Sequence, residues 1–172
     1  MTAHFSVHTS VKVGLLTVDK KMPGGRDIGY VGDIKNVDSK ILMDLLEKDF
    51  LPIVFPVGMD SEFNTYNINA DEAASAIATA LNAEKLVYLS DVEGVKTEAH
   101  NSETVISELR INEAENLIAA GTIKGGMLPK IKNCIMALKK GVTKIHIMDG
   151  RTPHSLLLEI FTDKGIGTVI LK

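Results

Sequence analysis

Three polar turns in the sequence combine residue types that could bind a charged substrate and transfer a group to it. The first turn, residues 66–71, reads Tyr-Asn-Ile-Asn-Ala-Asp and places two amides and a carboxylate just before a predicted helix. Asn67 could hold a substrate through its amide, and Asp71 could orient cationic groups. Because Asn69 and Asp71 are also good residues for a helix N-terminus, the turn is equally consistent with helix capping.

The second turn, residues 90–94, follows an apolar run that predicts a buried strand. An Asp at the exit of a strand with a nearby Gly could hold a ribose or an adenine. Asp and Gly also populate tight turns that have only a structural role. This turn is therefore weak evidence when taken alone.

The third turn, residues 124–130, reads Lys-Gly-Gly-Met-Leu-Pro-Lys and opens a predicted helix. Two glycines let a backbone approach a phosphate closely, and the free N–H groups of a helix start favour anions. Lys130 adds a positive charge one turn into the helix. The pattern predicts a polyphosphate site, although it is neither a Walker A loop nor a GxGxxG motif. The alternative is a glycine-rich helix entry without a ligand.

The elements that must position these turns alternate between helix and strand. Periodicity and capping signals predict helices within 41–46, 71–81, 112–121, 128–140 and 153–161, and strands at 51–55, 85–89, 143–148 and 166–171. Asn112 and Glu115 resemble a capping box at the start of the third helix. Residues 11–34, rich in glycine, predict a β-hairpin or meander. The alternation predicts an α/β fold, a three-layer αβα sandwich with a mainly parallel sheet, with ligands at the carboxyl ends of the strands.

Length and composition limit the classes of protein that this sequence can represent. The 172 residues predict one domain, 1–172. A formal net charge of −3 disfavours nucleic acid and anionic membranes as partners. The single Cys134 excludes an intrachain disulfide and a multi-cysteine zinc site, and it suits a cytoplasmic protein. We find no metal-binding motif, no signal peptide and no run of apolar residues long enough to span a membrane.

The three turns, in this order, resemble the amino acid kinase family and specifically its acetylglutamate kinase branch. Further blocks of the resemblance are His146-Ile-Met-Asp-Gly-Arg-Thr-Pro-His154, Leu157-Leu-Glu-Ile-Phe-Thr162 and Gly165-Ile-Gly-Thr168. The similarity covers nearly all of the chain from about Val13 onward. It implies ATP-dependent phosphorylation of the side-chain carboxylate of N-acetyl-L-glutamate, a step of arginine biosynthesis.

The resemblance assigns roles to individual residues. It implies that Asn67 binds the substrate, that Asp71 organises catalytic lysines and that Lys130 stabilises the transition state. Mg²⁺ would be held mainly by the phosphates of ATP, with no metal ligand from the protein. The residues that it implies for ATP binding are Ser90, Asp91, Gly94, Val95, Lys96, Thr122, Ile123, Lys124, Gly125, Gly126 and Met127.

The resemblance also implies a regulatory site and a missing part. His146, Glu159 and Gly165 would form a feedback site for L-arginine; a core histidine and a solvated glutamate are the alternative. The N-terminal lobe of the family precedes the matching region, so we expect a homo-oligomer or a second chain that supplies it. Without that lobe, the chain could be a non-catalytic nucleotide-binding or arginine-binding module. A kinase acting on aspartate, glutamate or a nucleoside monophosphate is the other enzymatic alternative.

Overall fold

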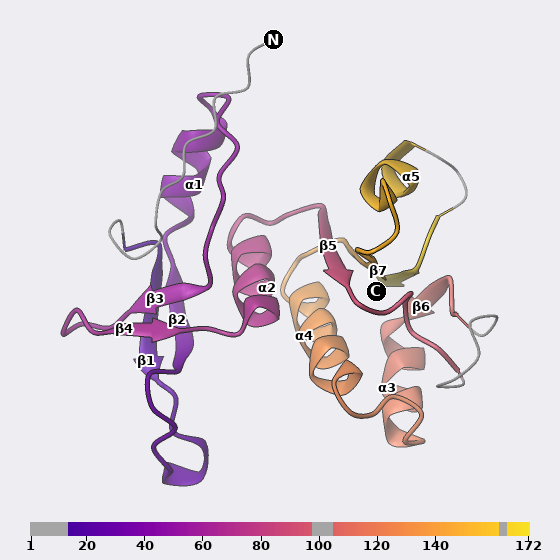
Figure 1. Cartoon of the computed structure of the whole chain (residues 1–172), viewed down its shortest axis with the longest axis horizontal. Coiled ribbons are helices and arrows are strands. Elements are labelled where there is room, and N and C mark those ends of the chain that lie inside the picture. The colour runs from indigo at the N-terminus through magenta and orange to yellow at the C-terminus, as the bar shows by residue number, and fades with distance from the viewer. Residues whose placement is uncertain (1–13, 98–104, 162–164) are drawn as a thin grey trace. The chain divides into compact units, whose positions relative to one another are not determined.

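The chain folds into two compact α/β units, each with its own four-stranded sheet (Figure 1). This computed structural model describes residues 14–97, 105–161 and 165–172. One unit ends at Leu81 and the other begins at Asn82. That the whole chain behaves as one domain stays a prediction, since two compact units can still fold cooperatively.

The first unit contains a mixed sheet with the strand order β2-β1-β3-β4. Its strands are β1 (Leu16–Lys20), β2 (Gly32–Val37), β3 (Val57–Met59) and β4 (Thr65–Asn67), and its helices are α1 (Ser39–Leu46) and α2 (Ala70–Ala80). β1 and β2 form an antiparallel pair within the region predicted as a hairpin, whose residues 11–13 lie outside the described part. β1 and β3 are parallel, and β3 and β4 are antiparallel.

Apolar side chains from both helices and from the sheet form the core of the first unit. Leu16 and Val18 of β1 are buried with Leu42 of α1, and Tyr66 and Ile68 join them from β4 and the residues after it. The helices start where the sequence supplies an acceptor for their free N–H groups. The Asp38 carboxylate caps α1 at Lys40 N, 3.2 Å away.

The second unit holds the strand order β5-β7-β8-β6. Its elements are β5 (Lys85–Ser90), β6 (Glu108–Arg110), α3 (Ile111–Ala119), α4 (Met127–Lys139), β7 (Lys144–Asp149), α5 (Ser155–Phe161) and β8 (Thr168–Leu171). β5 and β7 are parallel in full register from Lys85–Lys144 to Ser90–Asp149. Four consecutive residues of β7 are buried, as expected for a central strand with both faces covered.

The α/β class is confirmed, and both sheets are mixed: β1–β2 and β3–β4, which follow one another along the chain, pair antiparallel in the first sheet, and β8 breaks the parallel order of the second. β8 is parallel to β6 but antiparallel to β7. β8 starts with Thr168 opposite Ile147 and runs back along β7, so that Leu171 lies opposite Lys144.

The prediction of a buried strand at 51–55 is wrong. No strand forms there, and the large side chains of Leu51, Ile53 and Phe55 are exposed. Pro52 and Pro56 have no backbone N–H to contribute to a ladder. Pairing starts only at Val57, in β3.

The predicted capping box of α3 is also wrong by two residues. The helix begins at Ile111, and it is the Glu113 carboxylate that accepts the Arg110 N–H, at 2.8 Å. Glu115 instead pairs with Lys139 of α4 at 2.8 Å. The acid that reaches back must be at the third helical position, and the start of α3 decides which acid that is.

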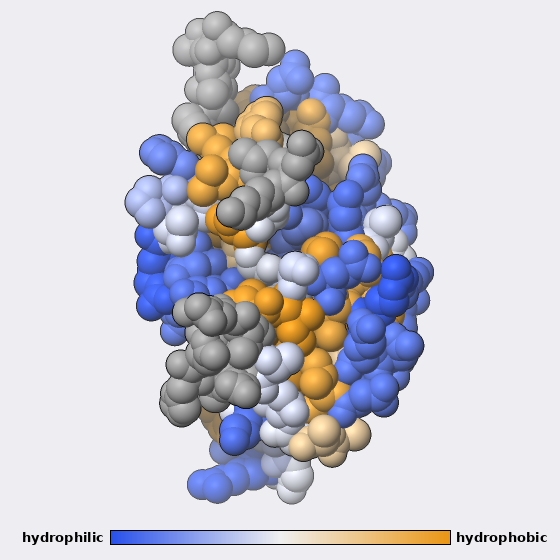
Figure 2. Space-filling view, turned by 90° about the vertical axis from the view of Figure 1, so that its right-hand side faces the viewer, coloured by the Kyte–Doolittle hydropathy of each residue, from blue (hydrophilic) through white to orange (hydrophobic). Residues whose placement is uncertain are grey.

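Several large apolar side chains remain at the surface. Leu157 and Phe161 of α5 are exposed, for example. Figure 2 shows one face of the molecule, on which apolar residues reach the surface between hydrophilic ones. Within the described residues, no helix has the length and apolar character needed to cross a membrane.

Candidate functional site

The parallel strands β5 and β7 end at the same edge of the second sheet. Ser90 is in register with Asp149, and Gly150 N donates to the Ser90 carbonyl at 2.8 Å. The loops that leave both strands therefore begin side by side. This is the edge at which ligands gather in α/β folds.

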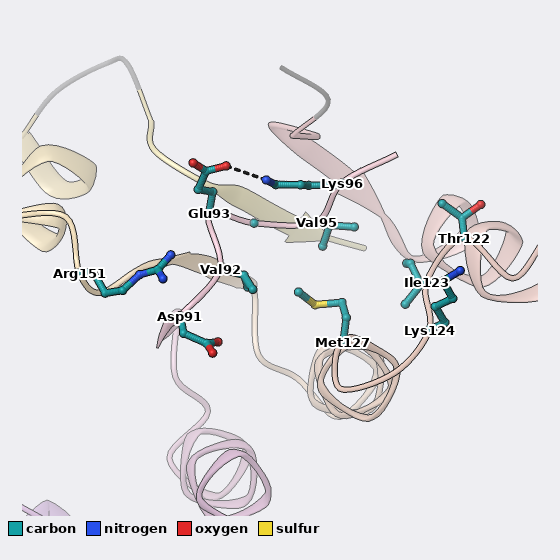
Figure 3. A pocket seen from close by; sticks show the side chains of 11 residues that line it. Asp91, Val92, Glu93, Val95, Lys96, Thr122, Ile123, Lys124, Met127 and Arg151 are labelled. Carbon is teal, nitrogen blue, oxygen red and sulfur yellow. Dashed lines mark ion pairs between the residues drawn. The ribbon is translucent and has the colours of Figure 1, made fainter. Parts of the chain in front are cut away.

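A pocket of about 350 Å³ opens beside these loops (Figure 3). Met127 points from the start of α4 toward Val92, and Arg151 and Lys124 lie on opposite sides of the pocket. The lining residues are Asp91, Val92, Glu93, Gly94, Val95, Lys96, Thr122, Ile123, Lys124, Met127 and Arg151. Eight of the residues predicted to bind ATP thus surround one pocket, whereas Ser90, Gly125 and Gly126 adjoin it without lining it.

Buried contacts hold the 91–96 loop against β8. The Val95 N–H donates to the Thr168 hydroxyl oxygen at 2.8 Å, and both residues are buried. Gly94 has a φ of +154°, and a Cβ there would lie 2.6 Å from the same oxygen. Only glycine allows this close approach, so the loop has a fixed position.

The turn from α3 into α4 is anchored at one point and open at the next. Ile123 is buried, and its N–H and that of Thr122 both donate to the Leu117 carbonyl. Gly125 has a φ of +58°, and a Cβ at Gly125 or at Gly126 would meet no atom within 4 Å. The backbone that leads into α4 is therefore accessible from the solvent.

The charges around the pocket are partly paired. Lys96 forms an ion pair with Glu93 at 2.8 Å (Figure 3). The Asp149 carboxylate accepts from Nε of Arg151 at 2.9 Å and from a terminal nitrogen at 2.8 Å. These hydrogen bonds hold the pKa of Asp149 at about 2. The Arg151 guanidinium is thereby oriented while its other N–H groups remain available.

Val92 and Glu93 lie within the second polar turn of the sequence, whereas sequence reasoning missed Arg151 as a lining residue. A local signal for Arg151 does exist. Asp149 ends β7, and its carboxylate also accepts the backbone N–H of Arg151 at 2.9 Å, as is usual for an Asp followed by a turn. An arginine two residues after a strand-ending aspartate is therefore placed at the ligand edge of the sheet.

Lys130 lies on α4 but does not line the pocket. Its Nζ is 4.8 Å from the centre of the Tyr88 ring. An ammonium group is attracted electrostatically to the face of an aromatic ring, so the Lys130 side chain is directed toward Tyr88. Its catalytic role stays a prediction.

Asn67 and Asp71 belong to the first unit. Asn67 is the last residue of β4 and is exposed, and its N–H donates to the Tyr30 carbonyl at 2.9 Å. The helix-capping interpretation holds for Asn69, whose side-chain oxygen accepts the N–H groups of Asp71 and Glu72. Asp71 lies in the first turn of α2. Capping by Asn69 leaves the predicted functions of Asn67 and Asp71 open.

The three residues of the predicted arginine site meet in a second hollow, of about 230 Å³. His146 is the third residue of β7, and its Nδ1 is 2.6 Å from Glu159 Oε1. The other carboxylate oxygen accepts the Ile166 N–H at 3.0 Å, beside Gly165. Burial lowers the pKa of His146, and Nε2 has no hydrogen-bond partner within the described residues.

The pocket combines strand-end acids, lysines and a glycine-led helix, which are features that α/β domains commonly use to hold anionic ligands. A model of the amino acid kinase family matches residues 4–149. The chain belongs to this family. In the described part of the chain, no group of three or more His, Cys, Asp or Glu side chains is arranged to hold a metal ion.

Curated relatives within the family carry a more specific name. An acetylglutamate kinase of Petrotoga mobilis is 50% identical over 158 residues, which are 92% of this chain and 52% of the relative. One of Campylobacter jejuni subsp. doylei is 55% identical over 144 residues, or 84% and 51%. The chain thus spans about half the length of these relatives.

Solved structures agree with the fold. An N-acetylglutamate synthase from Neisseria gonorrhoeae, complexed with coenzyme A and L-arginine, has a TM-score of 0.86 and 29% identity over 100% of this chain and 39% of its own. A carbamate kinase from Giardia has a TM-score of 0.72 and 19% identity, over 99% and 63%. The second likeness supports the fold alone.

Proposed function

We propose that this chain forms the nucleotide-binding part of an acetylglutamate kinase, which phosphorylates the side-chain carboxylate of N-acetyl-L-glutamate with ATP. Identity of about half of all residues to enzymes of that name is the observation that carries the proposal. The activity would belong to an assembly that also contains the part of the family domain that this chain does not span. We expect this chain to form part of a three-layer αβα sandwich with a mainly parallel sheet. Cys134, the single cysteine of the sequence, is buried, and this suits a cytoplasmic location.

In this proposal, ATP occupies the pocket between the 91–96 loop and the start of α4. The first N–H groups of α4 and the charge of Lys124 would face the phosphates, because helix N-termini and lysines both favour anions. Asp91 would accept from a ribose hydroxyl or from the adenine amino group. Mg²⁺ would accompany the phosphates and neutralise charge that develops on the transferred group.

Positioning and charge neutralisation would supply the catalysis. The carboxylate of N-acetylglutamate is ionised near pH 7, so it attacks the γ-phosphorus without a general base. Lys130, on the first turn of α4, would stabilise the negative charge that moves onto the phosphoryl group. Asn67 would bind the substrate, and Asp71 would orient the catalytic lysines.

Equilibrium binding tests the nucleotide part with the chain alone. Isothermal titration calorimetry with a non-hydrolysable ATP analogue should show one site, and Lys124→Ala should weaken it by about tenfold. Lys140→Ala, at the C-terminal end of α4, is the control that should leave the affinity unchanged. An analogue that does not bind, or that binds both variants equally, would contradict the proposal. Trapping of the acyl phosphate with hydroxylamine tests turnover in the complemented assembly.

The second hollow supports arginine as a further ligand. The likeness to a synthase structure complexed with L-arginine and the buried His146–Glu159 pair favour this ligand. A guanidinium would have to replace the present partners of the Glu159 carboxylate. Titration with L-arginine should shift the amide signals of His146, Glu159 and Gly165, and Glu159→Gln should abolish the shifts. Arginine binding without any turnover in the complemented assembly would favour a non-catalytic module.

A further inference from the structure

The connection between β1 and β2 lies against the end of β4. The backbone N–H of Lys21 donates to the Val31 carbonyl at 2.8 Å, which closes the connection at its base. The Asn67 N–H donates to the Tyr30 carbonyl at 2.9 Å, and Val31 and Asn67 form a parallel bridge. The Tyr30 and Tyr66 rings are 5.9 Å apart. The connection therefore contacts the residue that is proposed to bind the substrate.

Apolar packing contributes little to the position of this connection. None of residues 21–31 is buried. Gly24, Gly25 and Gly29 have positive φ angles, and a Cβ at any of them would meet no atom within 4 Å. A surface segment with few buried contacts opens easily unless polar contacts hold it. Hydrogen bonds and ion pairs must therefore keep the connection against Asn67.

Lys21 links the connection to the start of α2. Its Nζ lies 2.7 Å from Asp33 Oδ1 in β2 and 3.4 Å from both carboxylate oxygens of Glu72. Glu72 is in the first turn of α2, and the Asn69 side chain caps its N–H. The hydrogen bond to Asp33 raises the pKa of Lys21, so the ammonium group is charged at neutral pH. One charged group thus joins the residue after β1, the second residue of β2 and the helix that carries Asp71.

Two other ion pairs of the hairpin have a different reach. Lys20 pairs with Asp27 at 2.6 Å, and Lys35 pairs with Asp19 at 2.8 Å. Both pairs join residues within the hairpin itself, and exposed pairs of this kind contribute little to stability. The Lys21 side chain is only 31% exposed, so water screens its interactions less. Its contacts are therefore better suited to hold one element against another.

We propose that Lys21 is a positioning residue for the acetylglutamate substrate. Its ion pairs hold the β1–β2 connection against the end of β4, so that the backbone of Asn67 is fixed and its amide side chain is presented in one orientation. The inference rests on the proposed function, because it takes Asn67 as the residue that binds the substrate. Without Lys21, the carboxylates of Asp33 and Glu72 also repel each other and an anionic substrate. The affinity for ATP should not depend on Lys21, since the residues that line the nucleotide pocket belong to the second unit.

Steady-state kinetics of the complemented assembly test this role, with hydroxylamine trapping of the acyl phosphate as the assay. Lys21→Met removes the charge and keeps most of the apolar stem. We expect it to raise the KM for N-acetyl-L-glutamate about fivefold, while kcat and the KM for ATP change by less than about twofold. Lys21→Arg keeps the positive charge and should restore the parent KM.

Two further variants separate this role from a general effect on the hairpin. Glu72→Gln should raise the same KM, and combining it with Lys21→Met should add little, because both changes break one interaction. Lys35→Met is the matched control, since it breaks the exposed pair with Asp19 and leaves the contacts to α2 intact. Hydrogen exchange of the Asn67 amide, measured on this chain, should become faster in Lys21→Met and stay at the parent rate in Lys35→Met. Circular dichroism checks that each variant folds.

The proposal is overturned if the KM for N-acetyl-L-glutamate in Lys21→Met stays at the parent value, if Lys35→Met raises it as much, or if the KM for ATP rises in parallel. An Asn67 amide that exchanges at the parent rate in Lys21→Met also overturns it. If Lys21→Met does not fold, Glu72→Gln decides by the same criteria. A parent assembly that binds ATP without phosphorylating N-acetyl-L-glutamate contradicts the proposed function instead, and the exchange of the Asn67 amide then decides whether Lys21 positions this residue.

Discussion

The Thr168 hydroxyl holds the 91–96 loop in place, and its removal should loosen the proposed nucleotide pocket. The hydroxyl oxygen accepts the N–H of Val95 at 2.8 Å across 73 positions of sequence, and both residues are 1% exposed. Thr168→Val keeps the shape of the side chain and removes the acceptor. Thr168→Ser keeps the acceptor and removes one methyl group. The two variants thus separate the hydrogen bond from the packing.

The expected magnitudes follow from the burial of this contact. A buried N–H left without a partner costs about 1–3 kcal/mol, because water cannot replace the lost acceptor. Loss of a buried methyl group costs about 1 kcal/mol. With a slope of about 2 kcal/mol/M in urea, Thr168→Val should lower the unfolding midpoint by about 1 M. Thr168→Ser should lower it by about half as much.

The decisive measurement is the hydrogen exchange of the Val95 amide together with the affinity for an ATP analogue. Thr168→Val should speed the exchange of this amide and weaken nucleotide binding several-fold, whereas Thr168→Ser should preserve both within experimental error. If the Val95 amide of Thr168→Val stays as protected as in the parent, the hydroxyl does not anchor the loop. Equal loosening in the two variants would refute the reasoning in the same way, since packing alone would then explain the effect.

Three further predictions concern the charged groups around the two hollows. In the complemented assembly, Lys130→Ala should reduce the rate of phosphoryl transfer by about 10²–10³ while changing the affinity for ATP less. A variant that retains more than half the parent rate would contradict the proposed role of Lys130 in stabilising the transition state. Arg151→Ala should raise the Kd for ATP more than the Kd for adenosine, and calorimetry with both ligands measures the difference. Arg151→Lys should not restore the affinity for ATP, because lysine cannot form both hydrogen bonds to Asp149. Lowering the pH from about 7.5 to about 5.5 should destabilise the fold, because burial lowers the pKa of His146 and the unfolded chain then takes up the proton first. His146→Gln should reduce that loss, as seen in urea midpoints at both pH values.

Local sequence signals were sufficient for most helices and for the two longest strands of the second unit. α2 was predicted at 71–81 and spans Ala70–Ala80, because alanine-rich helical periodicity begins just after the Asn69 cap. β5 and β7 were found because each carries a continuous apolar run. Only β7 is buried along most of its length, as a strand covered on both faces requires, whereas Leu89 of β5 is 52% exposed. These signals involve residues that are close together in the sequence. They can therefore be recognised without knowing which elements pack against one another.

The site itself depends on contacts that no local pattern encodes. Thr168 meets Val95 only because β8 lies beside the loop that follows β5, and Lys130 lies over Tyr88 only because the start of α4 lies close to β5. Arg151 reaches the pocket because β7 is in register with β5. The turns could therefore be predicted as candidates for binding, while the pairing of their residues required the fold.

The failed strand at 51–55 shows what an apolar alternation does and does not report. The pattern correctly predicts an extended chain with one face on a core, since Val54 packs inward and its neighbours point out. It contains no information on whether the strand's partner lies in the same chain.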